Sequence, residues 1–218
     1  MEINYKSKLT YKISSFNRKR KYNDFINNFL PTPDTTILDV GYNDNEYRDT
    51  ENYLEKNYPY QSKITALGIM EPKNFNKSYP EVKTVSYDGN NFPFGNKEFD
   101  ICWSNAVIEH VGNFDKQVFF VKELIRTGKS VFFTTPNRLF PVEIHNRMPL
   151  LHYLPKSFFD RIMISLNKTR WTGDNLHILS YRKLLKILKA AGAVDYKIIR
   201  NKILGLTLDF TVIIKSTD

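Results

Sequence analysis

Cysteine is almost absent from this chain of 218 residues, in which Cys102 is the only one. One cysteine cannot form an internal disulfide or supply the several thiolates of a zinc site, which excludes a disulfide-stapled secreted scaffold. Long apolar runs are absent too, since stretches such as Val131–Phe133 fall far short of the roughly 18 residues that a membrane span needs. The first residues lack the basic-then-apolar order of a signal peptide. We therefore expect a cytoplasmic protein with no membrane span.

Acidic residues are outnumbered by basic ones, 23 to 32, which leaves a formal net charge of +9. Such an excess can mark a nucleic-acid-binding protein, because Lys and Arg displace counterions from phosphates. Only residues 18–21 (Arg-Lys-Arg-Lys) form a run, however, and the other Lys residues are scattered. We interpret the run as a solvent-exposed helix face and expect no dedicated nucleic-acid binding. A nucleic-acid-binding protein stays an alternative, which the salt dependence of oligonucleotide binding would test.

Hydrophobic residues make up 41% of the chain and aromatic residues 14%, enough for one sizeable core. Residues 15–30 carry apolar side chains near helical spacing, and Pro31 and Pro33 end this helix. Another helix is expected between the cap Ser180 and the stop Gly192. Helical or polar segments lie at 52–57, 106–111 and 116–125, and strands are expected at 36–40, 64–69, 82–86, 99–104, 130–135, 194–199 and 210–214.

This order of elements predicts an α/β fold, a Rossmann-like seven-stranded mixed sheet with helices on both faces. Five strands are expected to be parallel because helical segments separate them, and the last two to form an antiparallel pair because no helix lies between them. The chain, residues 1–218, is then one domain with a leader helix in 1–33 and an insertion at 138–179. Ligands of doubly wound sheets bind outside the carboxyl ends of the strands, so chemistry is expected there.

Two consecutive segments carry the most specific pattern. The first, Asp88–Phe94, reads Asp-Gly-Asn-Asn-Phe-Pro-Phe, and the second, Phe99–Val111, reads Phe-Asp-Ile-Cys-Trp-Ser-Asn-Ala-Val-Ile-Glu-His-Val. They resemble the third and fourth motifs of the class I S-adenosylmethionine-dependent methyltransferases, specifically the broad small-molecule subgroup. Residues 134–138, 140–141 and 149–155 are also similar to methyltransferases of this type. The resemblance spans roughly residues 37–214 and implies S-adenosylmethionine as the cofactor.

The resemblance also implies which strand ends would hold that cofactor. Glu71, after the second expected strand, can accept from both ribose hydroxyls, with a solvated acid as the other interpretation. Asp88 can accept from the adenine amino group while the backbone of Gly89 contacts the ring, with a simple Asp-Gly turn as the alternative. The other candidate cofactor-binding residues lie at the ends of the first and fourth strands: Asp39, Gly41, Tyr42, Asn43 and Asn105.

The loop after the first strand departs from the family pattern. The family places several glycines there, which let the backbone approach the cofactor, whereas residues 39–46 read Asp-Val-Gly-Tyr-Asn-Asp-Asn-Glu and keep only Gly41. Asn43 and Asn45 tolerate left-handed geometry, but their side chains occupy space that glycine would leave open. The alternative is therefore a catalytically inactive, methyltransferase-like binding or assembly protein.

Two histidines are the candidate catalytic residues. His110 is expected at the start of the helix after the fourth strand, where an imidazole with a pKa of about 6.5 can deprotonate an acceptor hydroxyl. A hydrogen-bonded structural histidine is the other interpretation. His145 lies in the insertion, whose many aromatic residues are typical of a cover over an acceptor site. His145, His152 and His177 with Asp174 lack the tight ligand spacing of a metal site such as His-Glu-x-x-His, so we expect no metal.

These features predict transfer of the methyl group of S-adenosylmethionine to oxygen or nitrogen of a small metabolite, lipid or sugar. The reaction needs mainly proximity and alignment, because the sulfonium is already activated. Fold alone cannot establish such an activity. The expected partner is a small-molecule methyl acceptor, and the sequence gives neither its identity nor the oligomeric state. Titration with S-adenosylmethionine separates the enzyme from the inactive alternative.

Overall fold

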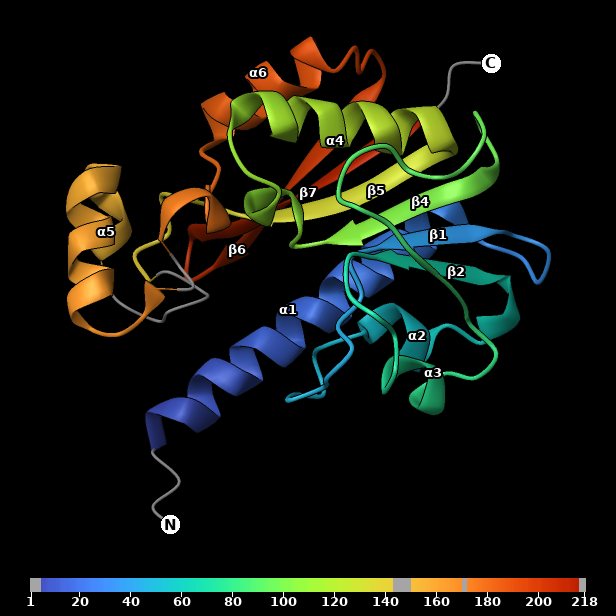
Figure 1. The fold of residues 1–218 in the computed structure, drawn as a ribbon, viewed down its shortest axis with the longest axis horizontal. Helices are drawn as coiled ribbons and strands as arrows, with labels where there is room; N and C mark the ends of the chain where they lie inside the picture. The colour runs from blue at the N-terminus through green and yellow to red at the C-terminus, as the bar shows by residue number, and fades with distance from the viewer. Residues whose placement is uncertain (1–4, 143–149, 170–171, 216–218) are drawn as a thin grey trace.

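The structure is a computed structural model that describes residues 5–142, 150–169 and 172–215. Its seven strands are β1 (Ile37–Val40), β2 (Ile64–Gly68), β3 (Lys83–Ser86), β4 (Phe99–Asn105), β5 (Gly128–Pro136), β6 (Tyr196–Ile203) and β7 (Leu206–Lys215). They form one sheet in the order β3-β2-β1-β4-β5-β7-β6 (Figure 1).

Helices and short 3-10 turns connect these strands. The α-helices are α1 (Tyr5–Phe29), α2 (Tyr53–Asn57), α3 (Phe75–Ser78), α4 (Phe114–Thr127), α5 (Lys156–Ser165) and α6 (Tyr181–Ala190). The 3-10 turns are η1 (Gln61–Lys63), η2 (Ile108–His110), η3 (Leu151–Tyr153) and η5 (Gly173–Asn175). Within the described ranges, no helix combines the length and the apolar character needed to cross a membrane.

The strand directions confirm the predicted fold class. β1 pairs in parallel with β2 on one side and with β4 on the other, and β2–β3 and β4–β5 are parallel as well. β7 runs antiparallel to both β5 and β6. The chain moves outward from β1 to β3 and then returns to β4, so the topological switch point lies between β1 and β4. Ligands of such sheets bind at the carboxyl ends of these two strands.

Buried apolar side chains on both faces hold the sheet between two layers of helices. On one face, Leu38 of β1 belongs to the same buried cluster as Leu124 of α4 and Leu184 of α6. On the other face, Phe25 of α1 packs edge-on against Trp103 and Phe132, with ring centroids 5.0 and 5.6 Å away. Figure 1 shows α4 and α6 on one side of the sheet and α1 on the other. This arrangement matches the run of four buried residues in β1.

Helix ends follow the predicted signals. The hydroxyl of Ser180 accepts a hydrogen bond from the backbone N–H of Lys183 and caps α6. Gly192 ends the same helix with a φ of +80°, in the left-handed region that favours glycine. The prediction for residues 106–111 needs a correction, because no α-helix forms there. Ala106 turns the chain with a φ of +60°, and the 3-10 turn η2 follows, so His110 ends a turn instead of starting a helix.

The predicted insertion at 138–179 begins and ends at one point of the sheet. Asn137 forms a bridge with Leu179, and the N–H of Arg138 donates to the carbonyl of Leu179 at 2.9 Å. The described residues between them include η3, α5 and η5. The insertion therefore leaves from, and returns to, the carboxyl end of β5.

Candidate functional site

The loops that follow β1 and β4 meet at the switch point. Gly41 has a φ of +104°, and a Cβ atom there would lie 2.3 Å from a methyl carbon of Val107. No larger residue fits without moving the loop after β4. Gly41 also donates from its N–H to the carbonyl of Leu67 at 2.8 Å, which holds the loop against β2. Gly41, the one glycine that the first loop keeps, thus stands where the loop backbone lies too close to Val107 for any side chain.

Side-chain hydrogen bonds hold the rest of the first loop. Asn52 accepts from the N–H of Asn43 at 2.9 Å and donates to its carbonyl at 2.8 Å. Asp44 accepts from the N–H of Asn74 at 2.7 Å, and Asn45 accepts from the Asn74 amide at 2.8 Å. The side chains of Asp44 and Asn45 are therefore engaged with the segment that leads into α3. These side-chain contacts fix the conformation of the loop. In glycine-rich sequences, the flexible backbone itself allows such a loop to form.

The Tyr42 side chain belongs to the core. It is 4% exposed, and its ring packs on that of Phe75 with centroids 4.7 Å apart. A Cβ atom on Gly68 would lie 2.5 Å from the Tyr42 ring, so the tyrosine fills the space beside β2. Its hydroxyl donates to the carbonyl of Met70, and burial raises its pKa. Any contact of Tyr42 with a cofactor would have to come from its backbone.

Asp39 faces another acid beneath the switch point. Its carboxyl group is buried near that of Glu55, which comes from α2 and is fully buried, and neither carboxylate oxygen of Glu55 has a hydrogen-bond partner within the described residues. Burial raises the pKa of both groups, and for Asp39 the neighbouring carboxyl raises it further. Two carboxylates this close repel each other, and burial penalises the charged form of each. The end of β1 and α2 therefore place two acids together whose neutral forms are favoured.

Lys21 corrects the prediction that the basic run of α1 faces solvent. It is 5% exposed, and its Nζ lies 3.1 Å from Asp209 Oδ2 of β7. Nζ also donates to Asn105 Oδ1 at 3.2 Å and lies 3.4 Å from Thr134 Oγ1. Lys21 is thus buried because the carboxyl ends of β4 and β5 and the adjacent first half of β7 supply it with three oxygen acceptors. Asn105, predicted to contact the cofactor, uses its side-chain oxygen for Lys21 and for the Thr134 hydroxyl, 2.6 Å away.

Arg18 lies one helical turn before Lys21 on α1. It is partly buried, and it has neither a hydrogen bond nor an ion pair within the described part of the chain. Burial lowers its pKa, while the carboxylates of Asp209, Glu109, Glu51 and Asp39 raise it. These acids come from β7, from η2 and from both ends of the loop after β1. Arg18 therefore sits among carboxylates at the switch point without being paired to any of them.

The first loop also contacts α1. Tyr11 of α1 donates its hydroxyl to the carboxylate of Asp49, and Thr50 beside it is buried. Tyr11 and Arg18 are seven residues apart and so share a helix face. That face and the first loop border the space at the carboxyl ends of β1 and β4.

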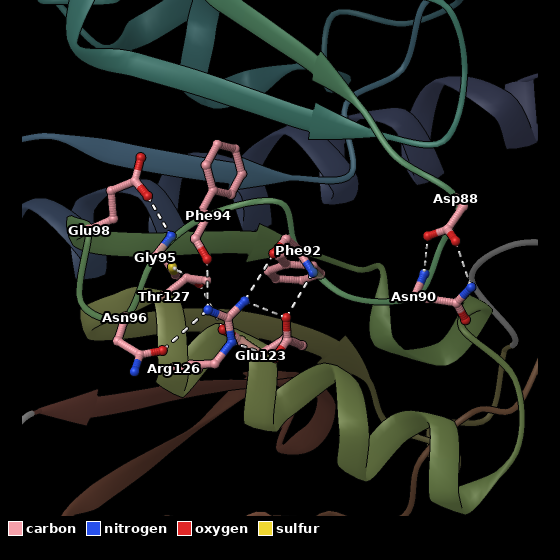
Figure 2. Close-up of polar contacts among 11 residues, drawn as sticks. Asp88, Asn90, Phe92, Phe94, Gly95, Asn96, Glu98, Glu123, Arg126 and Thr127 are labelled. Carbon is pink, nitrogen blue, oxygen red and sulfur yellow. Dashed lines mark hydrogen bonds and ion pairs between the residues drawn. The ribbon is translucent and has the colours of Figure 1, made fainter.

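A second group of candidate residues lies at the end of β3. Asp88 accepts from the N–H of Asn90 at 3.0 Å and from its amide at 2.8 Å, which lowers the pKa of Asp88 (Figure 2). Gly89 has a φ of +86°, and its nearest neighbour is Ile69, which follows β2 and is 71% exposed. An exposed apolar side chain thus lies beside an exposed carboxylate. This pairing suits a flat ring that carries a hydrogen-bond donor.

Two residues of α4 hold the loop between β3 and β4. Arg126 donates to the carbonyls of Phe92 and Phe94 at 3.0 and 2.7 Å, and Glu123 accepts from the N–H of Phe92 at 2.7 Å (Figure 2). The two side chains are joined by a pair of 2.7 Å contacts. We call Arg126 and Glu123 the α4 clamp. It fixes the loop segment that continues from Asp88.

The remaining candidates lie apart from these two groups. Glu71 is exposed, and its carboxylate lies 3.0 Å from Nζ of Lys73. His110 is exposed, with Nδ1 2.9 Å from the carbonyl of Asn175 in η5. Its neighbour Glu109 is fully buried and accepts from Thr135 at 3.1 Å. His145 lies outside the described residues.

The sequence pattern did not indicate Arg18, Lys21 or the α4 clamp as parts of the site. A signal for Lys21 was present, because Asn17, Lys21 and Phe25 recur at steps of four and so share one helix face. A cation on the apolar face of a helix needs a buried partner. The sequence carries no such signal for the α4 clamp, because Glu123 and Arg126 are three positions apart on a helix, a spacing that is typical of ordinary surface ion pairs.

Comparison with known proteins connects this geometry to a fold family. No protein-family model and no curated protein matches the chain. Among solved structures, a SAM-dependent methyltransferase from Methanosarcina mazei matches with 15% identity and a TM-score of 0.54, over 89% of this chain and 98% of that one. A SAM-dependent methyltransferase from Aquifex aeolicus matches with 16% identity and a TM-score of 0.54, over 88% and 87%. The N-terminal domain of EvdMO1 with SAH bound matches with 15% identity and a TM-score of 0.56, over 92% and 81%. The chain therefore has the class I SAM-dependent methyltransferase fold.

Proposed function

We propose that this protein transfers the methyl group of S-adenosylmethionine to oxygen or nitrogen of a small acceptor, a metabolite, lipid or sugar. The observation that carries the proposal is the unpaired guanidinium of Arg18 at the switch point. A partly buried guanidinium without a partner is costly unless an anionic group pairs with it. The fold supports the choice of cofactor, since its solved relatives are SAM-dependent methyltransferases.

The residues at the switch point fit the amino-acid end of S-adenosylmethionine. That end carries a carboxylate and an ammonium group. Arg18 can bind the carboxylate with two parallel hydrogen bonds, and the carboxylates of Glu51 and Glu109 lie near Arg18 to attract the ammonium. Gly41 is exposed beside them, and its close approach to Val107 excludes a larger residue. The site thus offers both signs of charge to a zwitterion.

The end of β3 fits the adenosine end. Asp88 already accepts two hydrogen bonds from Asn90, and its carboxylate has room for a further donor such as the adenine amino group. Ile69 and Gly89 would contact the ring from the side. Glu71 is the proposed ribose-binding acid, and reaching the hydroxyls requires it to release Lys73.

The bound cofactor would supply an activated methyl group, so the protein has to align the acceptor and exclude water. We assign the proton of an acceptor hydroxyl to His110. Its Nδ1 lies 2.9 Å from the Asn175 carbonyl, which favours the tautomer that donates from Nδ1 and keeps a lone pair on Nε2. A base of this kind contributes on the order of 10² to 10⁴ in rate.

Calorimetric titration of the full chain tests the cofactor assignment. Wild-type protein should bind S-adenosylmethionine and S-adenosylhomocysteine (SAH). The Arg18→Gln variant should bind both more weakly, by about tenfold to a hundredfold, since hydrogen bonds to charged groups are worth about 1.5–3 kcal/mol. Adenosine has no carboxylate, so its affinity should not change in Arg18→Gln. Lys19→Gln, on the exposed side of the same helix, is the matched control.

The absence of heat with all three nucleosides, up to the millimolar range, would overturn the cofactor assignment. An equal loss for adenosine and SAH would remove Arg18 from the carboxylate site. The inactive binding protein stays the second candidate, favoured by the first loop, which side-chain bonds hold in place of glycines. Binding of SAH without any turnover of S-adenosylmethionine across oxygen and nitrogen acceptors would support it.

A further inference from the structure

A groove of about 400 Å³ lies on the side of α1 that faces the turn between β6 and β7. Arg20 of α1 joins its two walls by donating to the carbonyl of Lys202 at 2.9 Å. The groove is lined by Lys12, Ile13 and Phe16 of α1 and by Lys202, Ile203 and Leu204 of the turn. Two of these six residues are basic and none is acidic. The groove therefore combines four apolar side chains with two cations.

Leu204 lies at the tip of the turn, although leucine side chains are usually buried and non-glycine residues usually avoid a positive φ. It is 97% exposed, and its φ is +49°. Gly205 follows with a φ of +80°, and Ile203 pairs with Leu206, so Leu204 and Gly205 form a two-residue hairpin loop. Turns with positive φ at both positions favour Asn before Gly. The exposed side chain of Leu204 adds little to the stability of the fold, so we look for its role in contact with another surface.

Other exposed apolar side chains gather at the same edge of the sheet. β6 runs parallel to β5, since both are antiparallel to β7, so the β6–β7 turn lies at the carboxyl edge. Figure 1 shows α5, the first half of α1 and the end of β6 on one side of the molecule. The segments that leave this edge expose Phe16, Ile69, Met70, Leu139, Leu150, Phe158, Ile164, Leu204 and Leu206. Arg161 of α5 lies over the ring of Phe158 at 5.9 Å, so a cation accompanies the apolar side chains there as well.

We propose that this carboxyl edge docks on an anionic lipid bilayer. Phe16 and Leu204 would enter the boundary between headgroups and acyl chains, and Lys12 and Lys202 would bind lipid phosphates. Apolar side chains spread over several segments with cations between them suit a membrane surface better than the contiguous apolar core of a protein interface. The charge is complementary too, because the chain carries a net charge of +9 and the groove has no acid.

Docking in this orientation would bring the candidate site to the membrane surface. α1 separates the two features, with Arg18 on the side of the strand ends and Phe16 in the groove. The opening at the carboxyl edge would then lie at the level of the lipid headgroups. The docking proposal does not depend on methyl transfer, because the residues that line the groove are not among those proposed to bind the cofactor.

Vesicle flotation of the full chain tests the proposal. Wild-type protein should float with vesicles of phosphatidylcholine and phosphatidylglycerol in equal parts, and much less with phosphatidylcholine alone. Leu204→Asn should weaken binding about tenfold, because it removes a leucine side chain from the bilayer. Its melting temperature should be unchanged or higher, since Asn suits the turn. Val194→Asn is the matched control, because Val194 is 85% exposed but precedes β6 at the opposite edge.

The charge is tested with a second pair of variants. Lys202→Gln should weaken binding to the anionic vesicles about fivefold, whereas Lys215→Gln, at the opposite end of β7, should not. Failure of the wild type to float with anionic vesicles, or equal losses in Leu204→Asn and Val194→Asn, would overturn the proposal. Sedimentation showing self-association that Leu204→Asn abolishes, without vesicle binding, would assign the edge to a second copy and also overturn it.

Discussion

Replacement of Lys21 by Met tests the docking of α1 on the sheet. Methionine keeps most of the side-chain volume but removes the charge that lies 3.1 Å from Asp209. Breaking a buried ion pair by removing one partner costs about 3–5 kcal/mol. Asp209 keeps hydrogen bonds from the amides of Asn17 and Asn201, so we expect the lower end of this range, about 3 kcal/mol. That is a large part of the stability of a domain this size.

Urea unfolding followed by tryptophan fluorescence measures this change, because Trp103 is buried against Phe25 of α1. Lys19→Met is the matched control, since it removes the same charge from an exposed position of the same helix. It should change the free energy of unfolding by less than about 0.5 kcal/mol. Adding Asp209→Asn to Lys21→Met should recover part of the loss, because no unpaired charge then stays buried.

Equal free energies of unfolding for Lys21→Met and Lys19→Met would refute the reasoning. Lys21 would then be solvated, as the charge run in the sequence predicts. Failure of Asp209→Asn to recover any stability would refute the ion pair itself while leaving the burial of Lys21 in place.

Arg126→Gln should lower the free energy of unfolding by about 2 kcal/mol, because it releases Glu123 and the loop between β3 and β4. Since that loop continues from the proposed adenine site, the variant should also weaken SAH binding in calorimetry, and unchanged SAH affinity would contradict a positioning role. Glu55→Gln should alter the pH dependence of stability. Burial raises the pKa of Asp39 and Glu55, so the folded chain holds protons that the unfolded chain releases, and stability falls as pH rises from about 4 through the raised pKa values. The variant should flatten this fall in urea unfolding across pH, and an unaltered slope would contradict the raised pKa of Glu55. Burial raises the pKa of Cys102 to about 12, so a thiol reagent should label it only as fast as the protein unfolds. Rapid labelling of the folded protein would contradict the burial of Cys102.

The positions of the parallel strands could be predicted from the sequence because burial on both faces leaves short continuous apolar runs. Such runs place β1 and β2 within one residue of their observed bounds. The antiparallel pair followed from the lack of a helix between its strands, and the observed pairing of β6 with β7 confirms it. The ends were harder to predict, as β6 runs four residues past the expected end at Ile199. Tertiary pairing extends a strand beyond the reach of its own apolar pattern.

The candidate site was less accessible to prediction, because long-range partners decide which way a polar side chain points. Lys21 and Asp209 are far apart in the chain, and each alone reads as a surface residue. Asp39 was expected to contact the cofactor, and the structure places its buried carboxyl group near that of Glu55, a neighbour that the sequence pattern did not indicate. The close approach of Gly41 to Val107 is backbone geometry that no single motif encodes. Motifs therefore located the strand ends, and the fold decided which side chains meet there.

The contact between Lys21 and Asp209 also bears on the order of events during synthesis. The two residues are 188 positions apart, so a ribosome adding about 5–20 residues per second makes the second roughly 10–40 s after the first. Phe25 can pack on Phe132 once β5 has emerged, but this docking would bury Lys21 without its counter-charge. We therefore expect α1 to dock more weakly until β7 has entered between β5 and β6, by about the 3 kcal/mol that loss of the ion pair costs. The first helix to be synthesised would then dock fully only after the last strand is in place, and the same delay would apply to the side chain of Arg18 on that helix.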